Sequence, residues 1–311
     1  MTTTRARGTQ CPRLVLLAAA LLFPTVAPSA AGPTREVVDE TGRLVRVPAH
    51  IERVISLAPN LTEIVYALGQ ESRLVGVSNQ CDFPPAARGK PRVGDVINPS
   101  LERIIELRPD VVLGTTAGNR RETVQALEHA RISLYGVAPR SVEGILTSIR
   151  HVAELLDVAP AGEELAGRLQ ARLDALPRRL ADRRHPRVLF ILWLEPLLTA
   201  GGDTFLNDIL RRAGADSVTA DIKEDWPRLS LEVVIERDPD YLVLPRSPSL
   251  EARLAELTSR PPWSRLRAVE QHHIVWLDES VMRPGPRVAE AIESLARALH
   301  PEAFSPLEAA R

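Results

Sequence analysis

The sequence predicts an α/β protein built as two lobes joined by a long helix. Short apolar runs alternate with helical patterns in the first half of the chain, and the alternation returns in the second half. A strandless helical stretch separates the two halves, and one segment of the first half recurs in the second. An alternating strand–helix order is typical of a parallel sheet with helices on its faces.

The first half opens with residues 35–47, which alternate in polarity around Thr41-Gly42 and predict a β-hairpin. Apolar runs and helical periodicity then predict strands at 53–57, 74–77, 111–114 and 132–137, and helices at 60–68, 101–107 and 119–130. From Ser141 to about Arg184 the pattern is helical throughout, and Pro177 should kink or end the helix. Strands follow at 187–193, 241–244 and 274–277, again with helices between them.

An internal repeat links the two halves. Residues 95–113 read DVINPSLERIIELRPDVVL and residues 225–243 read DWPRLSLEVVIERDPDYLV, so the two copies lie 130 positions apart. Each copy predicts a loop, an N-cap Ser, a short helix, a Pro-Asp turn and a strand. Two similar lobes that face each other form a cleft, which is the usual place for a small-molecule site.

The N-terminus is typical of a secretory signal peptide. Arg5, Arg7 and Arg13 precede an apolar run at 14–23, which is too short to span a bilayer, and small residues follow at 29–31. No Cys follows this run at a cleavage site, so a lipid anchor is not expected; an uncleaved short anchor is the alternative. The predicted organisation is a signal peptide at 1–31, an N-terminal lobe at 32–158, a connecting helix at 159–184 and a C-terminal lobe at 185–311.

Composition excludes several classes of function. Loss of residues 1–31 removes three Arg and no acid, so the net charge falls from −1 to −4, which argues against a nucleic-acid partner. The sequence has no nucleophile-elbow, zinc-protease, dinucleotide-binding or P-loop motif, and its histidines lack ligand spacing. We therefore expect a monomer that is not an enzyme, with no metal and no cofactor. Cys81 is expected to be a small buried side chain rather than a reactive thiol.

Three residues in loops of the second half are candidates for ligand binding. Trp226 lies on the loop before the second repeated helix, where its indole would address the cleft; packing in the core or at a hinge is the alternative. Glu279 and Arg283 follow the strand that ends at Leu277, and the cation suits a polar or anionic edge of a ligand; surface solvation is the alternative.

Glu102 and Glu232 are candidates for partner docking. Each is the second residue after the N-cap Ser of its repeat copy. A carboxylate in the first turn stabilises a helix through its dipole, which is the simpler reading. A matched pair of negative charges on two related lobes also suits a pseudo-two-fold partner with basic sockets.

Four segments resemble a known family over residues 51–300: RVISLAPNLTEIVYALG, LVGVSNQCDFPP, NPSLERIIELRPDVVLG and RPGPRVAEAI. They look like the periplasmic binding proteins for vitamin B12 and iron complexes. The resemblance implies two Rossmann-like lobes, a rigid connecting helix and a periplasmic protein that delivers its ligand to an inner-membrane ABC permease with its ATPase. It also implies that Glu102 and Glu232 dock onto arginines of the permease.

The same resemblance implies a ligand site that uses Trp226, Glu279 and Arg283. Asp82, Asn60 and Asp95 are expected to join them; at Val96 and Gln80 this sequence lacks the aromatic residues of the B12-binding members. A corrinoid (cobalamin) is the ligand expected first. A ferric siderophore or haem is the alternative, and a Zn or Mn receptor or an enzyme on a related scaffold comes last.

Overall fold

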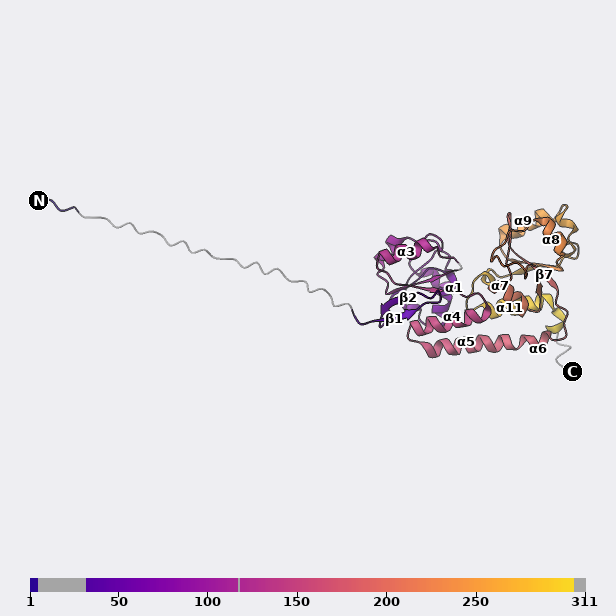
Figure 1. The fold of residues 1–311 in the computed structure, drawn as a ribbon, viewed down its shortest axis with the longest axis horizontal. Coiled ribbons are helices and arrows are strands. Elements are labelled where there is room, and N and C mark those ends of the chain that lie inside the picture. Colours follow the sequence, from indigo (N-terminus) through magenta and orange to yellow (C-terminus); the bar gives the residue numbers. More distant parts are fainter. Residues whose placement is uncertain (5–31, 117, 305–311) are drawn as a thin grey trace. The chain divides into compact units, whose positions relative to one another are not determined.

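The computed structural model describes residues 1–4, 32–116 and 118–304 (Figure 1). The predicted signal peptide falls almost wholly on residues 5–31, which lie outside the described part. A compact unit begins at Pro33. Among the helices of the described residues, none has the length and apolarity needed to cross a membrane.

The N-terminal lobe contains the predicted hairpin and a parallel sheet. Strands β1 and β2 pair antiparallel, and the sheet has the order β4-β3-β5-β6 with parallel neighbours throughout. The strands are β1 (Thr34–Val38), β2 (Leu44–Pro48), β3 (Val54–Ser56), β4 (Leu74–Val77), β5 (Val111–Thr115) and β6 (Leu134–Val137). The helices are α1 (Pro59–Ala67), α2 (Leu101–Glu106) and α3 (Arg121–His129), with short 3-10 turns at Glu71–Arg73 and Pro85–Gly89.

The C-terminal lobe repeats this plan and adds a strand. Its sheet has the order β11-β10-β7-β8. Strand β9 also pairs with β7, in parallel, whereas β8 pairs with β7 in the antiparallel sense. The strands are β7 (Arg187–Leu194), β8 (Leu197–Thr199), β9 (Asp216–Ser217), β10 (Tyr241–Pro245) and β11 (Ile274–Leu277). The helices are α7 (Phe205–Arg212), α8 (Leu231–Arg237), α9 (Pro248–Thr258), α10 (Arg267–Glu270) and α11 (Val288–Leu299), with 3-10 turns at Trp263–Arg265, Glu279–Met282 and Pro301–Phe304. The sequence did not predict β8 and β9, which are short.

The internal repeat occupies matching places in the two sheets. Helix α2 precedes β5 and helix α8 precedes β10, and each of these strands lies beside the first strand of its own sheet. Ser100 and Ser230 cap the two helices by accepting from the backbone N–H three residues on, at 3.3 and 3.4 Å. Asp110 accepts from the Arg53 N–H and Asp240 from the Arg187 N–H, both at 2.8 Å. The repeated Ser and Asp therefore have the same local structural task in each lobe.

The link between the lobes is a set of helices rather than one. Helix α4 (Val142–Leu155) is followed by α5 (Ala159–Asp174) and α6 (Leu176–Leu180). The connecting helix predicted over 159–184 is thus interrupted after Asp174, and Pro177 lies in the first turn of α6. A proline has no N–H to donate, so it is tolerated in a first turn and not inside a helix.

One apolar core passes through both lobes. It joins side chains of β3 and α1 with those of α4 and α5, and continues into α7 and α11 of the second lobe. Helices α4 and α5 lie side by side along it (Figure 1). The opposite face of each sheet has its own smaller core, under α2 and α3 in one lobe and under α8 and α9 in the other. A change in lobe orientation would disturb close packing in the shared core.

Candidate ligand-binding site

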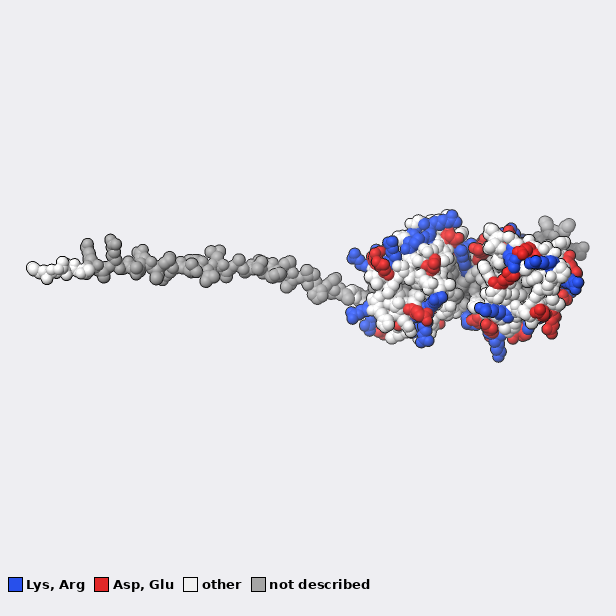
Figure 2. Space-filling view, turned by 90° about the horizontal axis from the view of Figure 1, so that it is seen from above, with Lys and Arg blue, Asp and Glu red and all other residues white. Residues whose placement is uncertain are grey.

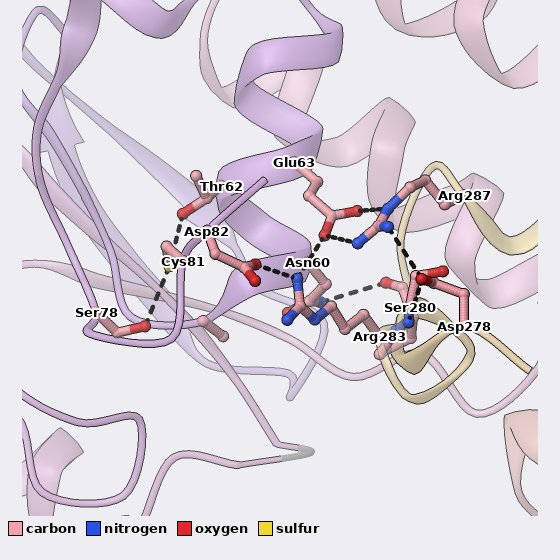
Figure 3. A network of polar contacts seen from close by, with 12 residues as sticks. Asn60, Thr62, Glu63, Ser78, Cys81, Asp82, Asp278, Ser280, Arg283 and Arg287 are labelled. Atoms are coloured by element: carbon pink, nitrogen blue, oxygen red, sulfur yellow. Dashed lines mark hydrogen bonds and ion pairs between the residues drawn. The ribbon is translucent and has the colours of Figure 1, made fainter. Parts of the chain in front are cut away.

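Loops that follow the strands of both sheets meet at the junction of the lobes. Asn60, just after β3, is buried and its Nδ2 donates to the Pro284 carbonyl oxygen of the other lobe at 3.3 Å. Asp82, after β4, accepts from Arg283 Nη1 at 2.7 Å (Figure 3). In open parallel sheets the carboxyl ends of the strands form the ligand crevice. The surface is hollowed between the lobes, with acidic and basic side chains near the groove (Figure 2).

The centre of the junction is a buried carboxylate between two arginines. Glu63 on α1 is only 3% exposed, and accepts from Arg287 Nε at 3.0 Å and Nη2 at 2.7 Å and from Arg283 Nη1 at 3.3 Å. Asp278 accepts from Arg287 Nη1 at 3.3 Å. With Asp82 these residues form an inter-lobe charge cluster. A buried charge is tolerated when it is paired and hydrogen-bonded. Both arginines donate hydrogen bonds to the Glu63 carboxylate and balance its charge.

Phe83 completes the cluster on its N-lobe side. The Arg287 guanidinium carbon lies 4.2 Å from the centre of the Phe83 ring, a cation–π distance. Arg287 is therefore held by a carboxylate on one side and by an aromatic face on another.

Arg283 is engaged within the protein rather than free for a ligand. Its hydrogen bond to Asp82 lowers the pKa of that carboxyl, with burial opposing the shift. The Asp82 side chain is still half-exposed, so the pair borders the groove. A ligand group that reaches Arg283 must share the guanidinium with Asp82. Glu279 is exposed in the 3-10 turn before Arg283.

Asp95 lies in a separate polar group on the N-terminal lobe. Its carboxylate accepts from Asn79 Nδ2 at 2.9 Å and from Gln80 Nε2 at 3.1 Å. The Gln80 Oε1 in turn accepts from the Val96 N–H at 3.3 Å. Gln80 and Val96 are thus hydrogen-bonded to each other beside Asp95.

Trp226 is 38% exposed on a loop that is fixed at both ends. The preceding Asp225 forms a bidentate ion pair with Arg140 of the N-terminal lobe, at 2.5 and 3.0 Å. Two residues after Trp226, Arg228 pairs with Leu198 of β8. The loop is therefore held at the lobe junction while the indole stays accessible.

A second tryptophan, Trp193, was not among the sequence candidates. It lies near the end of β7, is 50% exposed and pairs with Leu198, which pairs in turn with Arg228. Directly opposed residues share a face of a sheet, so Trp193, Leu198 and Arg228 lie on one face. The Gly201 N–H donates to the Asp225 carbonyl oxygen, which continues the pairing past Trp226. Residues two apart on a strand also share a face, so Trp226 lies on the same face as Arg228 and Trp193. An aromatic at the carboxyl end of a predicted strand was the available signal.

Glu63 was also missed. It is the one acid in the apolar stretch NLTEIVYAL, and nearly every residue of α1 around it is buried. A single carboxylate in a helix that is buried on most sides must find a cation, and that was the available signal.

The two docking candidates occupy equivalent exposed positions. Glu102 lies in the first turn of α2 and Glu232 in the first turn of α8, each after its capping Ser. A hydrogen bond from Ser230 lowers the pKa of Glu232. The geometry fits helix stabilisation and leaves both carboxylates open to a partner.

Cys81 is fully buried behind the groove. Thr62 Oγ1 lies 3.0 Å and Ser78 Oγ 3.1 Å from its sulfur, and burial raises the pKa of the thiol. This is the environment of a structural thiol. Among the described residues no group of three or more His, Cys, Asp or Glu side chains could hold a metal ion.

Comparisons with known proteins agree with this geometry. Residues 54–281 match a family model described as periplasmic binding protein. A vitamin B12-binding protein of Vibrio parahaemolyticus is 30% identical over 244 residues, which cover 78% of this chain and 87% of that protein. A periplasmic heme-binding protein from Roseiflexus sp. RS-1 is 30% identical with a TM-score of 0.73, covering 81% of this chain and 99% of that one. The periplasmic vitamin B12-binding protein of Vibrio cholerae is 26% identical with a TM-score of 0.72, covering 82% and 99%.

Proposed function

This chain belongs to the periplasmic binding protein family, and we propose that it is the solute-binding component of an ABC importer that captures a corrinoid between its lobes. Delivery of the ligand to a permease with its ATPase follows from that role. We further propose that the protein does no chemistry on the ligand, since its relatives are described as vitamin B12-binding proteins and as an ABC transporter substrate-binding lipoprotein.

The accessible indole of Trp226 is the observation that carries the ligand proposal. It is 38% exposed on a loop that the Asp225–Arg140 ion pair fixes at the lobe junction. Trp193 lies on the same face of the adjoining strands. An indole offers a large rigid apolar surface at low entropic cost, which suits a broad, flat macrocycle. The B12-binding relatives support the same ligand class.

The similar heme-binding proteins make haem or a ferric siderophore the second candidate. Haem iron needs an axial His, Cys, Met or Tyr from the protein. Tyr135 is buried in β6, Tyr241 stacks on His273 at 4.3 Å, and Cys81 is buried among hydroxyl groups. Met282, partly buried beside Arg283, is a candidate axial ligand next to the inter-lobe charge cluster. A corrinoid requires no such ligand, so we place it first.

Trp226→Ala is expected to weaken corrinoid binding by roughly 1–3 kcal/mol, by analogy with base–aromatic stacking. That loss corresponds to about a 5- to 150-fold rise in Kd. Calorimetry on purified protein with cyanocobalamin measures it, and Trp226→Phe is the matched control because it retains an aromatic face. Equal affinity of the Ala variant and the wild type would remove Trp226 from the site. Binding of haem or a ferric siderophore, with no heat from any corrinoid, would establish the second candidate instead.

Export is expected to produce a mature periplasmic protein that starts near Gly32. The basic n-region, the short apolar run and the small residues at 29–31 motivate this proposal. Intact-mass measurement of a periplasmic extract should give a species shortened by about the first 31 residues. Recovery at full-length mass in the membrane fraction alone would contradict cleavage.

A further inference from the structure

The two repeated helices each expose an isoleucine at the same place. Ile105 on α2 is 48% exposed and Ile235 on α8 is 46% exposed, and the two are equivalent positions of the repeat. The inward positions of the same helices, Ile104 and Val234, are each 1% exposed and pack in separate cores. The exposed isoleucines are therefore not needed to bury either helix.

Each isoleucine lies beside a glutamate on the exposed side of its helix. Residues three and four apart are neighbours on a helix surface. Glu102 precedes Ile105 by three residues and Glu232 precedes Ile235 by three, and all four of these residues are exposed. The chain presents the same acidic and apolar surface twice, once on each lobe. One exposed isoleucine is ordinary on a protein surface, but the same pair of isoleucine and glutamate at equivalent positions of two lobes suits a partner with paired sites.

We propose that Ile105 and Ile235 are apolar docking points that insert into two equivalent apolar sockets of the importer's permease, each socket flanked by cations. This inference rests on the proposed function and adds a second kind of contact to the glutamate pair. The occupant is the permease because two matched surfaces on a pseudo-two-fold chain fit a partner whose own sites are paired. The neighbouring carboxylates require basic groups there. Attraction between the opposite charges orients the two proteins as they approach, and burial of the isoleucines stabilises the complex.

The test separates apolar from electrostatic contributions through their salt dependence. Binding of ligand-loaded protein to the importer in nanodiscs is measured at low and high ionic strength for the wild type, Ile105→Ala with Ile235→Ala, and Glu102→Gln with Glu232→Gln. The isoleucine variant should bind about fivefold to a hundredfold more weakly, and this ratio should be the same at both ionic strengths. The loss from the glutamine variant should shrink at high ionic strength, because salt screens exposed charges.

Val38→Ala with Leu44→Ala is the matched control. These residues are 63% and 65% exposed on the β1–β2 hairpin, pair with each other and have no counterpart in the repeat. The control should bind the importer as the wild type does.

If the isoleucine variant binds the importer as tightly as the wild type at both ionic strengths, the inference is wrong and the proposed function is unaffected. An equal loss of affinity in the hairpin control would also overturn it, since the effect would then come from nonspecific apolar contact. Failure of the wild type itself to bind the importer, or any ligand by calorimetry, would instead refute the proposed function.

Discussion

Glu102→Arg combined with Glu232→Arg is expected to abolish transport while ligand affinity changes by less than about twofold. Both residues are exposed at equivalent places in α2 and α8, away from the inter-lobe charge cluster. Reversal of each charge converts attraction to basic sockets on the permease into repulsion, and like charges across an interface cost several kcal/mol. Uptake of labelled ligand into proteoliposomes measures transport, and calorimetry measures ligand affinity.

Glu122→Arg with Glu251→Arg is the control for this experiment. These glutamates lie in the first turns of α3 and α9, one in each lobe, so the same change of charge meets a similar helix dipole. The control should transport normally. If it fails as completely as the Glu102 and Glu232 variant, net charge rather than docking determines the loss. A parallel loss of ligand binding in the docking variant would show that these carboxylates serve the fold or the cleft.

Glu63→Ala is expected to destabilise the folded protein by roughly 3 kcal/mol or more. The Glu63 side chain is 2% exposed and accepts hydrogen bonds from Arg283 and Arg287, whose side chains are 17% and 19% exposed. Its removal leaves two largely buried guanidinium groups that are paired only with Asp82 and Asp278, whose side chains are 50% and 77% exposed. Urea unfolding followed by circular dichroism measures the change.

Glu163→Ala provides the comparison with an exposed ion pair. Glu163 accepts from Arg150 Nε at 2.7 Å, as close as the Arg287–Glu63 contact, but its side chain is 68% exposed. Water solvates both partners after the substitution, so the unfolding midpoint should stay near that of the wild type. Unfolding of Glu63→Ala at the wild-type midpoint would show that the inter-lobe charge cluster contributes no net stability.

The periodicity of the chain predicted most strands and helices because each buries a regular pattern of apolar residues. It did not predict β8, because three residues, Leu197–Thr199, carry too few side chains to show alternation. It also extended the connecting helix past Asp174, since Leu173, Leu176 and Leu180 keep helical spacing across the interruption. Pro177, just after the interruption, marked it in the sequence, and its position in the first turn of α6 explains it.

The candidate site was predictable to the level of loops and not of contacts. Trp226 was a candidate because it precedes a repeated helix, and the structure leaves its indole exposed. Arg283 was predicted as a ligand-binding residue, and its guanidinium is bound to Asp82 and Glu63. Its position in the chain predicts proximity to the cleft, but its partners come from α1 and the loop after β4, about 200 residues away.

The sequence by itself determined the two α/β lobes, the repeat that relates them, the family and the paired positions of Glu102 and Glu232. These depend on local periodicity and on residues that stand close together in the chain. Only the tertiary structure decided that Glu63 lies between Arg283 and Arg287, and that Trp193 shares a face with Trp226. Those relations depend on which strands and helices pack together, and the partners of a buried charge are set by that packing rather than by spacing along the chain.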